Sequence, residues 1–151
     1  MMRPAQVLIQ RLDKDLPIPS REMPGDAGFD IFSREDVRLE PGERRIIPTG
    51  IAIALPDGFV ALINPRSGLA AKHGFTLVNA PGTIDAGYRG EISVVGLNTG
   101  TEVISLNRAD RIAQLVIIQL PGISILEVGS LPESTRSDRG FGSTGGFATQ
   151  A

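Results

Sequence analysis

The chain has 151 residues and a formal net charge of −2, with 18 glycines, 11 prolines, one histidine and no cysteine. This length predicts one domain with a hydrophobic core, and the small net charge gives no attraction to nucleic acid or to an acidic membrane surface. The lack of cysteine excludes disulfides, thiolate metal sites and cysteine nucleophiles, and a single histidine excludes zinc centres built on several imidazoles.

Short apolar runs rich in valine and isoleucine, separated by turn residues, predict strands along most of the chain. One short helix is expected at 67–72. The predicted strands are 7–12, 29–32, 44–55, 59–63, 75–78, 91–97, 103–106, 112–120 and 123–128. Many short strands at this spacing favour an all-β fold, a sandwich or barrel of jelly-roll type, in a single β domain of residues 1–130.

Residues 131–151 are polar, rich in glycine and without periodicity, so they cannot bury enough apolar surface to fold alone. Their composition fits a disordered tail and equally a flexible C-terminal arm that closes over a ligand. Arg139 and Phe141 favour the arm. So does the run of glycine and hydroxyl residues at 142–146, because successive N–H groups of such a run can converge on one anion.

No apolar run approaches membrane-spanning length, and residues 1–15 lack the long apolar stretch of a signal peptide. We therefore expect a cytoplasmic protein. His73 lies in the sequence AAKHGF, where a surface or packing role is expected in preference to catalysis.

The segment GTIDAGYRGE, residues 82–91, is too polar and too rich in glycine for a core, yet it lies between two apolar runs. It contains Asp85 and Tyr88, the only tyrosine of the chain. Its glycines allow backbone angles that other residues resist. A tight hairpin that presents an acid beside an aromatic ring predicts a ligand site.

Three further stretches have both a functional and a structural interpretation. Arg66 and Ser67 precede the expected helix and could bind phosphate, or Ser67 could simply cap the helix. Asp26 and Asp30 could hold a hard cation such as Mg²⁺, or could form a solvent-facing turn. Arg111 and Gln114 are either polar residues at a sheet edge or ligand donors.

Taken together, the chain offers two arginine-bearing anion sites, acids for a metal and an acid in a glycine-rich turn, with no plausible covalent nucleophile. This inventory favours hydrolysis of a nucleoside triphosphate by water, which needs positioning and charge stabilisation more than covalent catalysis.

Five blocks, in this order, resemble the five motifs of the trimeric dUTPases, most closely those of bacteria. They are DAGFDIFS at 26–33, PRSGLAAKHGF at 65–75, GTIDAGYRGEI at 82–92, DRIAQLVI at 110–117 and RGFGSTGG at 139–146. The resemblance implies a jelly-roll-like fold and a homotrimer with active sites at the subunit interfaces. It also implies cleavage of dUTP to dUMP and pyrophosphate with Mg²⁺, which keeps uracil out of DNA and supplies dUMP for thymidylate synthesis.

The resemblance also implies a role for each site residue. Asp85 would be the general base that activates the attacking water at the α-phosphorus, and Asp30 would hold Mg²⁺ through water. Tyr88 would pack against the deoxyribose and leave no room for a 2′-hydroxyl. The remaining substrate contacts would be Asn79, Thr83, Ile84 and Asp85 to uracil, Arg66, Ser67, Gly68 and Gln114 to phosphates, and Arg139, Phe141, Gly142, Ser143 and Thr144 from the arm.

Ser93 stands where several bacterial relatives carry a lysine near the ligand, so that charge is missing here. Three alternatives remain at this point. A dCTP deaminase, or a bifunctional relative, would share the fold but typically carries a second serine after Ser67. A nucleotide-binding regulator without turnover would keep the pocket alone. A purely structural β-trimer would leave the polar blocks unexplained.

Overall fold

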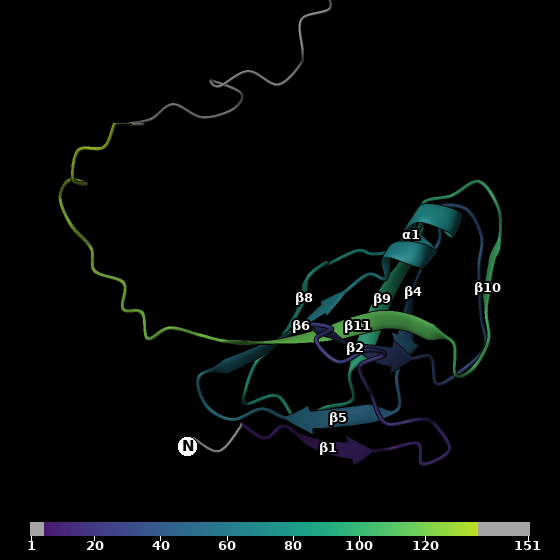
Figure 1. Ribbon diagram of the computed structural model, residues 1–151. Helices are drawn as coiled ribbons and strands as arrows, with labels where there is room; N and C mark the ends of the chain where they lie inside the picture. The colour runs from purple at the N-terminus through teal and green to yellow at the C-terminus, as the bar shows by residue number, and fades with distance from the viewer. Residues whose placement is uncertain (1–4, 136–151) are drawn as a thin grey trace, which may run out of the picture.

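The computed structural model describes residues 5–135, which form eleven strands and one short helix within that range. Figure 1 shows the strands wrapped into a barrel-like body. Their bounds are β1 (Leu8–Arg11), β2 (Gly28–Phe32), β3 (Val37–Leu39), β4 (Arg44–Pro48), β5 (Ile51–Ala54), β6 (Phe59–Asn64), β7 (Phe75–Leu77), β8 (Gly82–Ile84), β9 (Ser93–Asn98), β10 (Ile104–Leu106) and β11 (Arg111–Gln119), with helix α1 (Ser67–His73) between β6 and β7.

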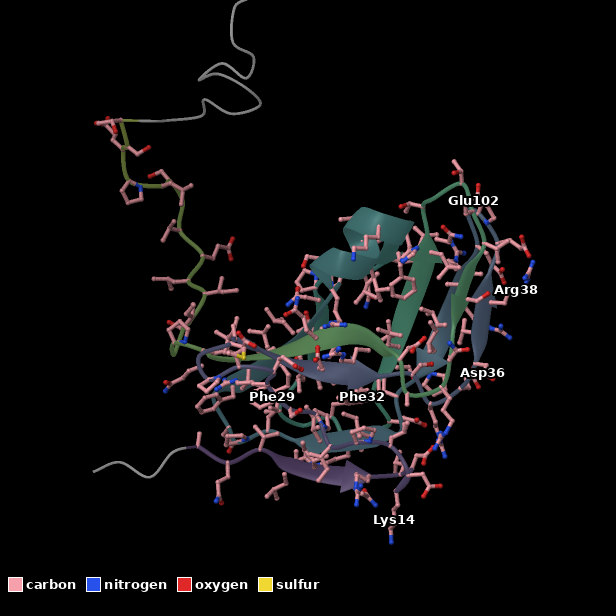
Figure 2. The ribbon with its side chains drawn as sticks, turned by 45° about the vertical axis from the view of Figure 1, so that its right-hand side comes forward. Lys14, Phe29, Phe32, Asp36, Arg38 and Glu102 are labelled. Carbon is pink, nitrogen blue, oxygen red and sulfur yellow. The ribbon has the colours of Figure 1, made fainter. Side chains whose placement is uncertain are left out.

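All strand pairs among the described residues are antiparallel, in the sheet orders β1-β5, β10-β3, β2-β11-β6-β8 and β4-β9-β7. Non-consecutive neighbours in each sheet give the jelly-roll type of connection that the sequence predicts. One apolar cluster fills the interior, where Ile31, Leu39, Ile47, Phe75 and Ile112 are fully buried. Figure 2 shows Phe29 and Phe32 on β2, the strand next to β11.

The run 44–55, predicted as one strand, is two strands that belong to different sheets. The chain turns at Gly50, whose φ of 72° lies in the left-handed region. A Cβ there would stand 2.9 Å from the Cβ of Asp13, so only glycine fits the turn. The alternating apolar pattern continues through this turn, so the sequence pattern alone does not reveal the break between β4 and β5.

The predicted strand at 123–128 is wrong, because no strand of this chain pairs with it within residues 5–135. Figure 1 shows the chain after β11 running away from the body. Ile125 is 99% exposed and Leu126 is 81% exposed. The segment therefore has the composition of a strand but no partner edge within residues 5–135.

Helix α1 begins one position after Arg66, which occupies the N-cap without a side-chain cap hydrogen bond. Ser67 is thus the first helical residue, and its proposed capping role is wrong. The helix ends at His73, and the C-cap residue Gly74 has a left-handed φ of 70°. Its N–H donates back to the carbonyl of Ala70. No helix in residues 5–135 is long and apolar enough to cross a membrane.

Candidate active site

The segment 82–91 is not a paired hairpin. Strand β8 pairs with β6, whereas β9 pairs with β4 and β7, so residues 85–92 form a loop that crosses from one sheet to another. The loop turns where the N–H of Tyr88 donates to the carbonyl of Asp85 over 3.0 Å. Asp85 therefore lies at the end of β8, exposed to solvent and beside the turn.

Tyr88 lies against the backbone of its own loop. Its hydroxyl donates to the carbonyl of Glu91 over 3.0 Å. A Cβ added to Gly90 would lie 2.7 Å from Cζ of the tyrosine, closer than real side chains pack. Gly90 thus lets the ring lie on the backbone, and 44% of the tyrosine stays exposed for a ligand.

A hollow of about 260 Å³ opens beside this loop, and we call it the loop hollow. Its lining combines two carboxylates, one aromatic ring and two aliphatic hydroxyls with the edge of β8. The lining residues are Thr83, Ile84, Asp85, Tyr88, Glu91, Ile92 and Ser93. Asn79 does not line the hollow, but its amide nitrogen lies 3.4 Å from the position of a Cβ on Gly82 at the start of β8.

A second hollow of about 310 Å³, called the helix hollow, opens at the start of α1. Gln114 is fixed there because its Nε2 donates to the carbonyl of Pro65 over 2.9 Å. Its Oε1 would collide with any Cβ on Gly28, so that position also requires glycine. The lining residues are Glu22, Asp26, Ala27, Gly28, Asp30, Arg66, Ser67, Gly68 and Gln114.

Asp30, which lines the helix hollow, is held by two guanidinium groups. Its Oδ1 lies 3.1 Å from Nε of Arg66, and its Oδ2 lies 3.3 Å from Nη1 of Arg111. Arg111 also reaches Glu22 over 2.9 Å. Arg111, which the sequence left as an edge residue or a ligand donor, is an anchor for Asp30.

The helix hollow fits a divalent cation only in a limited way. Within residues 5–135, no group of three histidine or carboxylate side chains is placed to hold a metal. Asp30 supplies oxygen atoms of the kind that Mg²⁺ prefers, but both already face arginines. Asp30 is therefore the carboxylate placed beside Arg66, and its oxygen atoms are already engaged by guanidinium groups.

The two hollows share no lining residue. Strand β6 explains their separation, because Ala61 pairs with Ile84 at one end while Asn64 pairs with Gln114 at the other. Three residue steps along a strand span roughly 10 Å. Asp85 lies beyond the first end of this ladder and Arg66 beyond the second, so one subunit holds them well apart.

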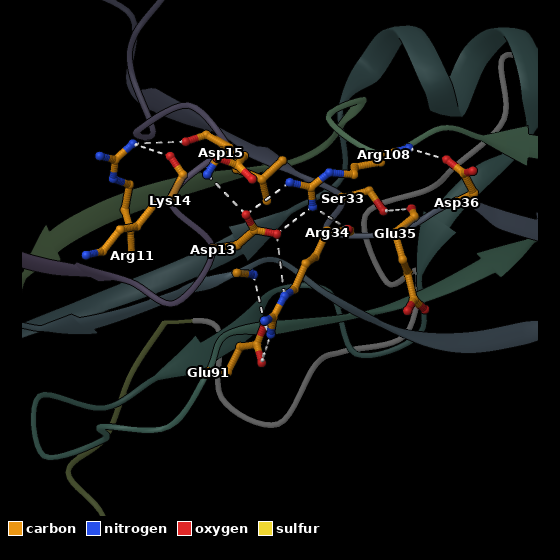
Figure 3. Close-up of polar contacts among 12 residues, drawn as sticks. Arg11, Asp13, Lys14, Asp15, Ser33, Arg34, Glu35, Asp36, Glu91 and Arg108 are labelled. Carbon is orange, nitrogen blue, oxygen red and sulfur yellow. Dashed lines mark hydrogen bonds and ion pairs between the residues drawn. The ribbon is translucent and has the colours of Figure 1, made fainter.

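A row of alternating charges runs up to the loop hollow (Figure 3), and the sequence analysis missed it. Nη2 of Arg108 donates to Asp13 over 3.0 Å, and Nε of Arg34 lies 3.6 Å from the same carboxylate. Nη1 of Arg34 lies 3.2 Å from Oε2 of Glu91. The hydrogen bond from Arg108 lowers the pKa of Asp13 from 3.8 to about 2, and the same contact raises the pKa of Arg108.

His73 is exposed in the last turn of α1, in agreement with the expected surface role. The five arm residues assigned to the ligand lie outside the described residues. They are Arg139, Phe141, Gly142, Ser143 and Thr144.

Known proteins match this chain over most of its length. The family model of the dUTPases matches residues 14–145. The deoxyuridine 5′-triphosphate nucleotidohydrolase of Thermobifida fusca is 59% identical over 147 residues, covering 97% of this chain and 82% of that protein. The enzyme of the same name from Mycolicibacterium vanbaalenii is 51% identical, covering 97% of this chain and 99% of that protein.

Two solved structures of phage dUTPases have the same fold. The dUTPase of Staphylococcus bacteriophage 80alpha, solved with dUPNHPP, superposes with a TM-score of 0.85 at 31% identity, covering 93% of this chain and 98% of that chain. A dUTPase of phage phi11 of S. aureus, described with a structural Mg(II) ion, gives a TM-score of 0.78 at 28% identity, covering 85% and 99% of the two chains.

Proposed function

The chain belongs to the dUTPase family and hydrolyses dUTP, and we propose that it does so by attack of water on the α-phosphorus, which releases dUMP and pyrophosphate. The observation that carries this proposal is the division of the site. One hollow presents an acid and a ring, and the other presents arginine, a helix start and a carboxylate.

Asp85 is the proposed general base. It is exposed at the end of β8 and lines the loop hollow, so a water molecule can reach its carboxylate. A carboxylate can accept a proton from an attacking water, although it is a weak base. Stabilisation of the phosphate charge must therefore supply much of the rate enhancement.

The loop hollow is the proposed nucleoside site. The exposed ring of Tyr88 is placed to lie against a deoxyribose, where a 2′-hydroxyl would collide with it. The backbone of Thr83, Ile84 and Asp85, together with Asn79, would pair with the polar edge of uracil. Ser93 lines the same hollow as a neutral hydroxyl. Once a bound nucleotide covers these polar groups, an analogue that leaves them unpaired would be rejected more strongly than one that only leaves an empty space.

The helix hollow is the proposed triphosphate site. Arg66 offers a forked cation, Ser67 and Gly68 offer the first N–H groups of α1, and Gln114 lies beside them. Mg²⁺ bound to the triphosphate would neutralise charge on the phosphate oxygens. Asp30 would hold that ion through water once the phosphates engage Arg66.

We infer that the active enzyme is a homotrimer whose sites are shared between subunits. Asp85 and Arg66 lie beyond opposite ends of the β6–β8 ladder and line separate hollows, and sharing between subunits would bring an Asp85 and an Arg66 to the same nucleotide. The apolar side chains of Ile125 and Leu126, exposed after β11, need a partner surface. The arm residues Arg139, Phe141, Gly142, Ser143 and Thr144 would then close over the phosphates and the base.

In the cell, this reaction would take place in the cytoplasm. It would keep uracil out of DNA by removing dUTP, and it would supply dUMP for thymidylate synthesis.

Pyrophosphate release from dUTP, dTTP, dCTP and UTP, with and without Mg²⁺, tests the proposal. We expect turnover of dUTP alone, with a strong dependence on Mg²⁺. Turnover of UTP comparable to that of dUTP would contradict the proposed role of Tyr88 in excluding ribose. Comparable turnover of dTTP would contradict the proposed role of the loop in recognising uracil. Full activity in excess chelator would contradict a role for Mg²⁺ in the reaction.

A further inference from the structure

We propose that Glu91 is a positioning residue for sugar discrimination, because it fixes the loop on which Tyr88 lies to the charged row of Arg108, Asp13 and Arg34. This inference rests on the proposed role of Tyr88 in excluding ribose. Glu91 does not need to touch the substrate. It acts by holding the backbone that orients the tyrosine ring.

The side chain of Glu91 is held at both carboxylate oxygens. Oε1 accepts from the N–H of Gly50 over 2.8 Å, and Oε2 lies 3.2 Å from Nη1 of Arg34 (Figure 3). About a quarter of the side chain, 26%, is exposed, so these charge-assisted contacts are only partly weakened by solvent. Both partners of Glu91 lie far from it in sequence, which makes the contact a true cross-link of the fold.

The other side of this cross-link is itself rigid. The carbonyl of Gly50 accepts from the N–H groups of Leu12 and Asp13, over 2.8 and 3.1 Å. The left-handed turn at Gly50 has no space for a side chain. Arg34 is held in turn, because Nη1 of Arg108 donates to its carbonyl over 2.8 Å. Glu91 is therefore bound to a fixed frame.

Tyr88 depends on Glu91 because the core does not hold it. With 44% of the residue exposed, its orientation rests on its stacking over Gly90 and on the bond from its hydroxyl to the Glu91 carbonyl. Both contacts are to the backbone of residues 90 and 91. Any displacement of that backbone moves the ring, and a ring that must exclude one hydroxyl tolerates little displacement.

Loss of the Glu91 side chain need not unfold the chain, because the next residue is anchored independently. The N–H of Ile92 donates to the carbonyl of Ile51 over 2.8 Å. The carbonyl of Ile92 accepts from the N–H of Thr49 over 3.2 Å. Ile92 is also fully buried. The N–H of Ile92 and the carbonyl of Glu91 belong to one planar peptide group, so that carbonyl keeps its place. The effect of a change at Glu91 should therefore fall on Gly90, the other backbone contact of the ring.

The experiment compares Glu91→Ala and Glu91→Gln with the wild type, and measures kcat and KM for dUTP and for UTP. We expect Glu91→Ala to lower the ratio of kcat/KM for dUTP over UTP about tenfold, the size of one lost charge-assisted hydrogen bond. Glu91→Gln keeps an oxygen for Gly50 and should lose less. Arg34→Ala should resemble Glu91→Gln, with recovery in Arg34→Lys.

Glu40→Gln is the matched control. Glu40, just after β3, forms an ion pair with Arg38 on β3 over 3.0 Å, and both side chains are mostly exposed. Figure 2 shows Arg38 at the margin of the molecule. It should leave the ratio unchanged. A second measurement, the double variant Tyr88→Phe with Glu91→Ala, should lower the ratio by less than the product of the single effects, because both act through one ring.

The outcomes separate this inference from the proposed function. A wild type that does not discriminate dUTP from UTP overturns the role of Tyr88, and with it this inference. A wild type that discriminates, with an unchanged ratio in folded Glu91→Ala, overturns this inference alone. If Glu91→Ala fails to fold, Glu91→Gln and Arg34→Ala decide in the same way, and an unchanged ratio in both rejects the role of Glu91.

Discussion

Asp30 and Arg66 face each other across the helix hollow, with Oδ1 of the aspartate 3.1 Å from Nε of the arginine. The proposed phosphate ligand and the proposed metal ligand are therefore paired with each other before any nucleotide arrives. In the proposed mechanism, binding of the triphosphate would exchange this pair, since Arg66 would turn to phosphate and the carboxylate of Asp30 would become available to the ion. Asp30 would then oppose phosphate binding in one step and support the metal in the next.

The first prediction follows from this exchange. Asp30→Asn should raise the Mg²⁺ concentration needed for half-maximal turnover about tenfold, because an amide attracts the hydrated ion less. The same variant should bind a non-hydrolysable dUTP analogue more tightly without Mg²⁺, since Arg66 is released. Metal titration of turnover and calorimetric binding in chelator measure the two effects. A loss of binding in chelator would contradict the exchange.

The second prediction concerns Asp85. Asp85→Asn should keep the affinity for a dUTP analogue and lose hydrolysis by roughly 10²–10⁴-fold, the contribution of a general base. Single-turnover kinetics and direct binding give the two quantities. Asp57→Asn, in the exposed turn between β5 and β6, is the control for loss of one surface carboxylate. Unchanged turnover in Asp85→Asn would assign the base to another group.

The third prediction uses two glycines of the same loop. Gly90→Ala places a methyl 2.7 Å from Cζ of Tyr88, so the ring must move, and the preference for dUTP over UTP should fall. Gly87→Ala is the matched control, because a Cβ there meets nothing within 4 Å. The ratio of kcat/KM for the two nucleotides is the measurement. Equal ratios in the two variants would show that the contact between ring and backbone does not set discrimination.

The fourth prediction tests the sharing of sites between subunits. Asp85→Asn and Arg66→Ala are each expected to be inactive, but subunits of the two variants, unfolded and refolded together, should regain activity. In random trimers, about a quarter of the sites would combine the intact halves of two subunits. Pyrophosphate release by the mixture, against each variant refolded alone, is the readout. No recovery in mixed trimers would place both halves in one subunit.

The fifth prediction concerns acid stability. Because the hydrogen bond from Arg108 lowers the pKa of Asp13 to about 2, this carboxylate stabilises the fold above its ordinary pKa of 3.8 and loses that effect as the pH falls toward 2. The gap in unfolding free energy between wild type and Asp13→Asn should therefore be constant near neutral pH and shrink between about pH 4 and 2. Urea unfolding at a series of pH values measures it, with Glu40→Gln as control.

The sequence predicted the parts of this molecule that local pattern encodes. Strands with strong apolar runs, such as β6 and β11, and the helix after Arg66 are where the pattern placed them. The three-residue strand β3 was missed, because the alternation of Val37 and Leu39 covers too few residues to be recognised as a strand pattern. Its strand geometry comes from pairing with β10. The break at Gly50 depends on crowding by Asp13, which no local pattern records.

The candidate site divides in the same way. Residue types at Asp85, Tyr88 and Arg66 could be read from the chain, because their chemistry is carried by the side chain itself. The support of Glu91 by Arg34 could not be predicted, since 57 positions separate the partners and isolated charges are common on surfaces. The distance between Asp85 and Arg66 also required the register of β6 with its two neighbours.

The bare apolar stretch after β11 has a consequence for how the protein behaves in dilute solution. A single subunit carries Ile123, Ile125, Leu126 and Leu131 in water, each at least 79% exposed. An exposed apolar segment of this kind can pair with open strand edges of other molecules, so an isolated subunit would be prone to aggregation. The proposed trimer and disordered aggregates would compete for the same surface, and the melting temperature would then depend on the protein concentration.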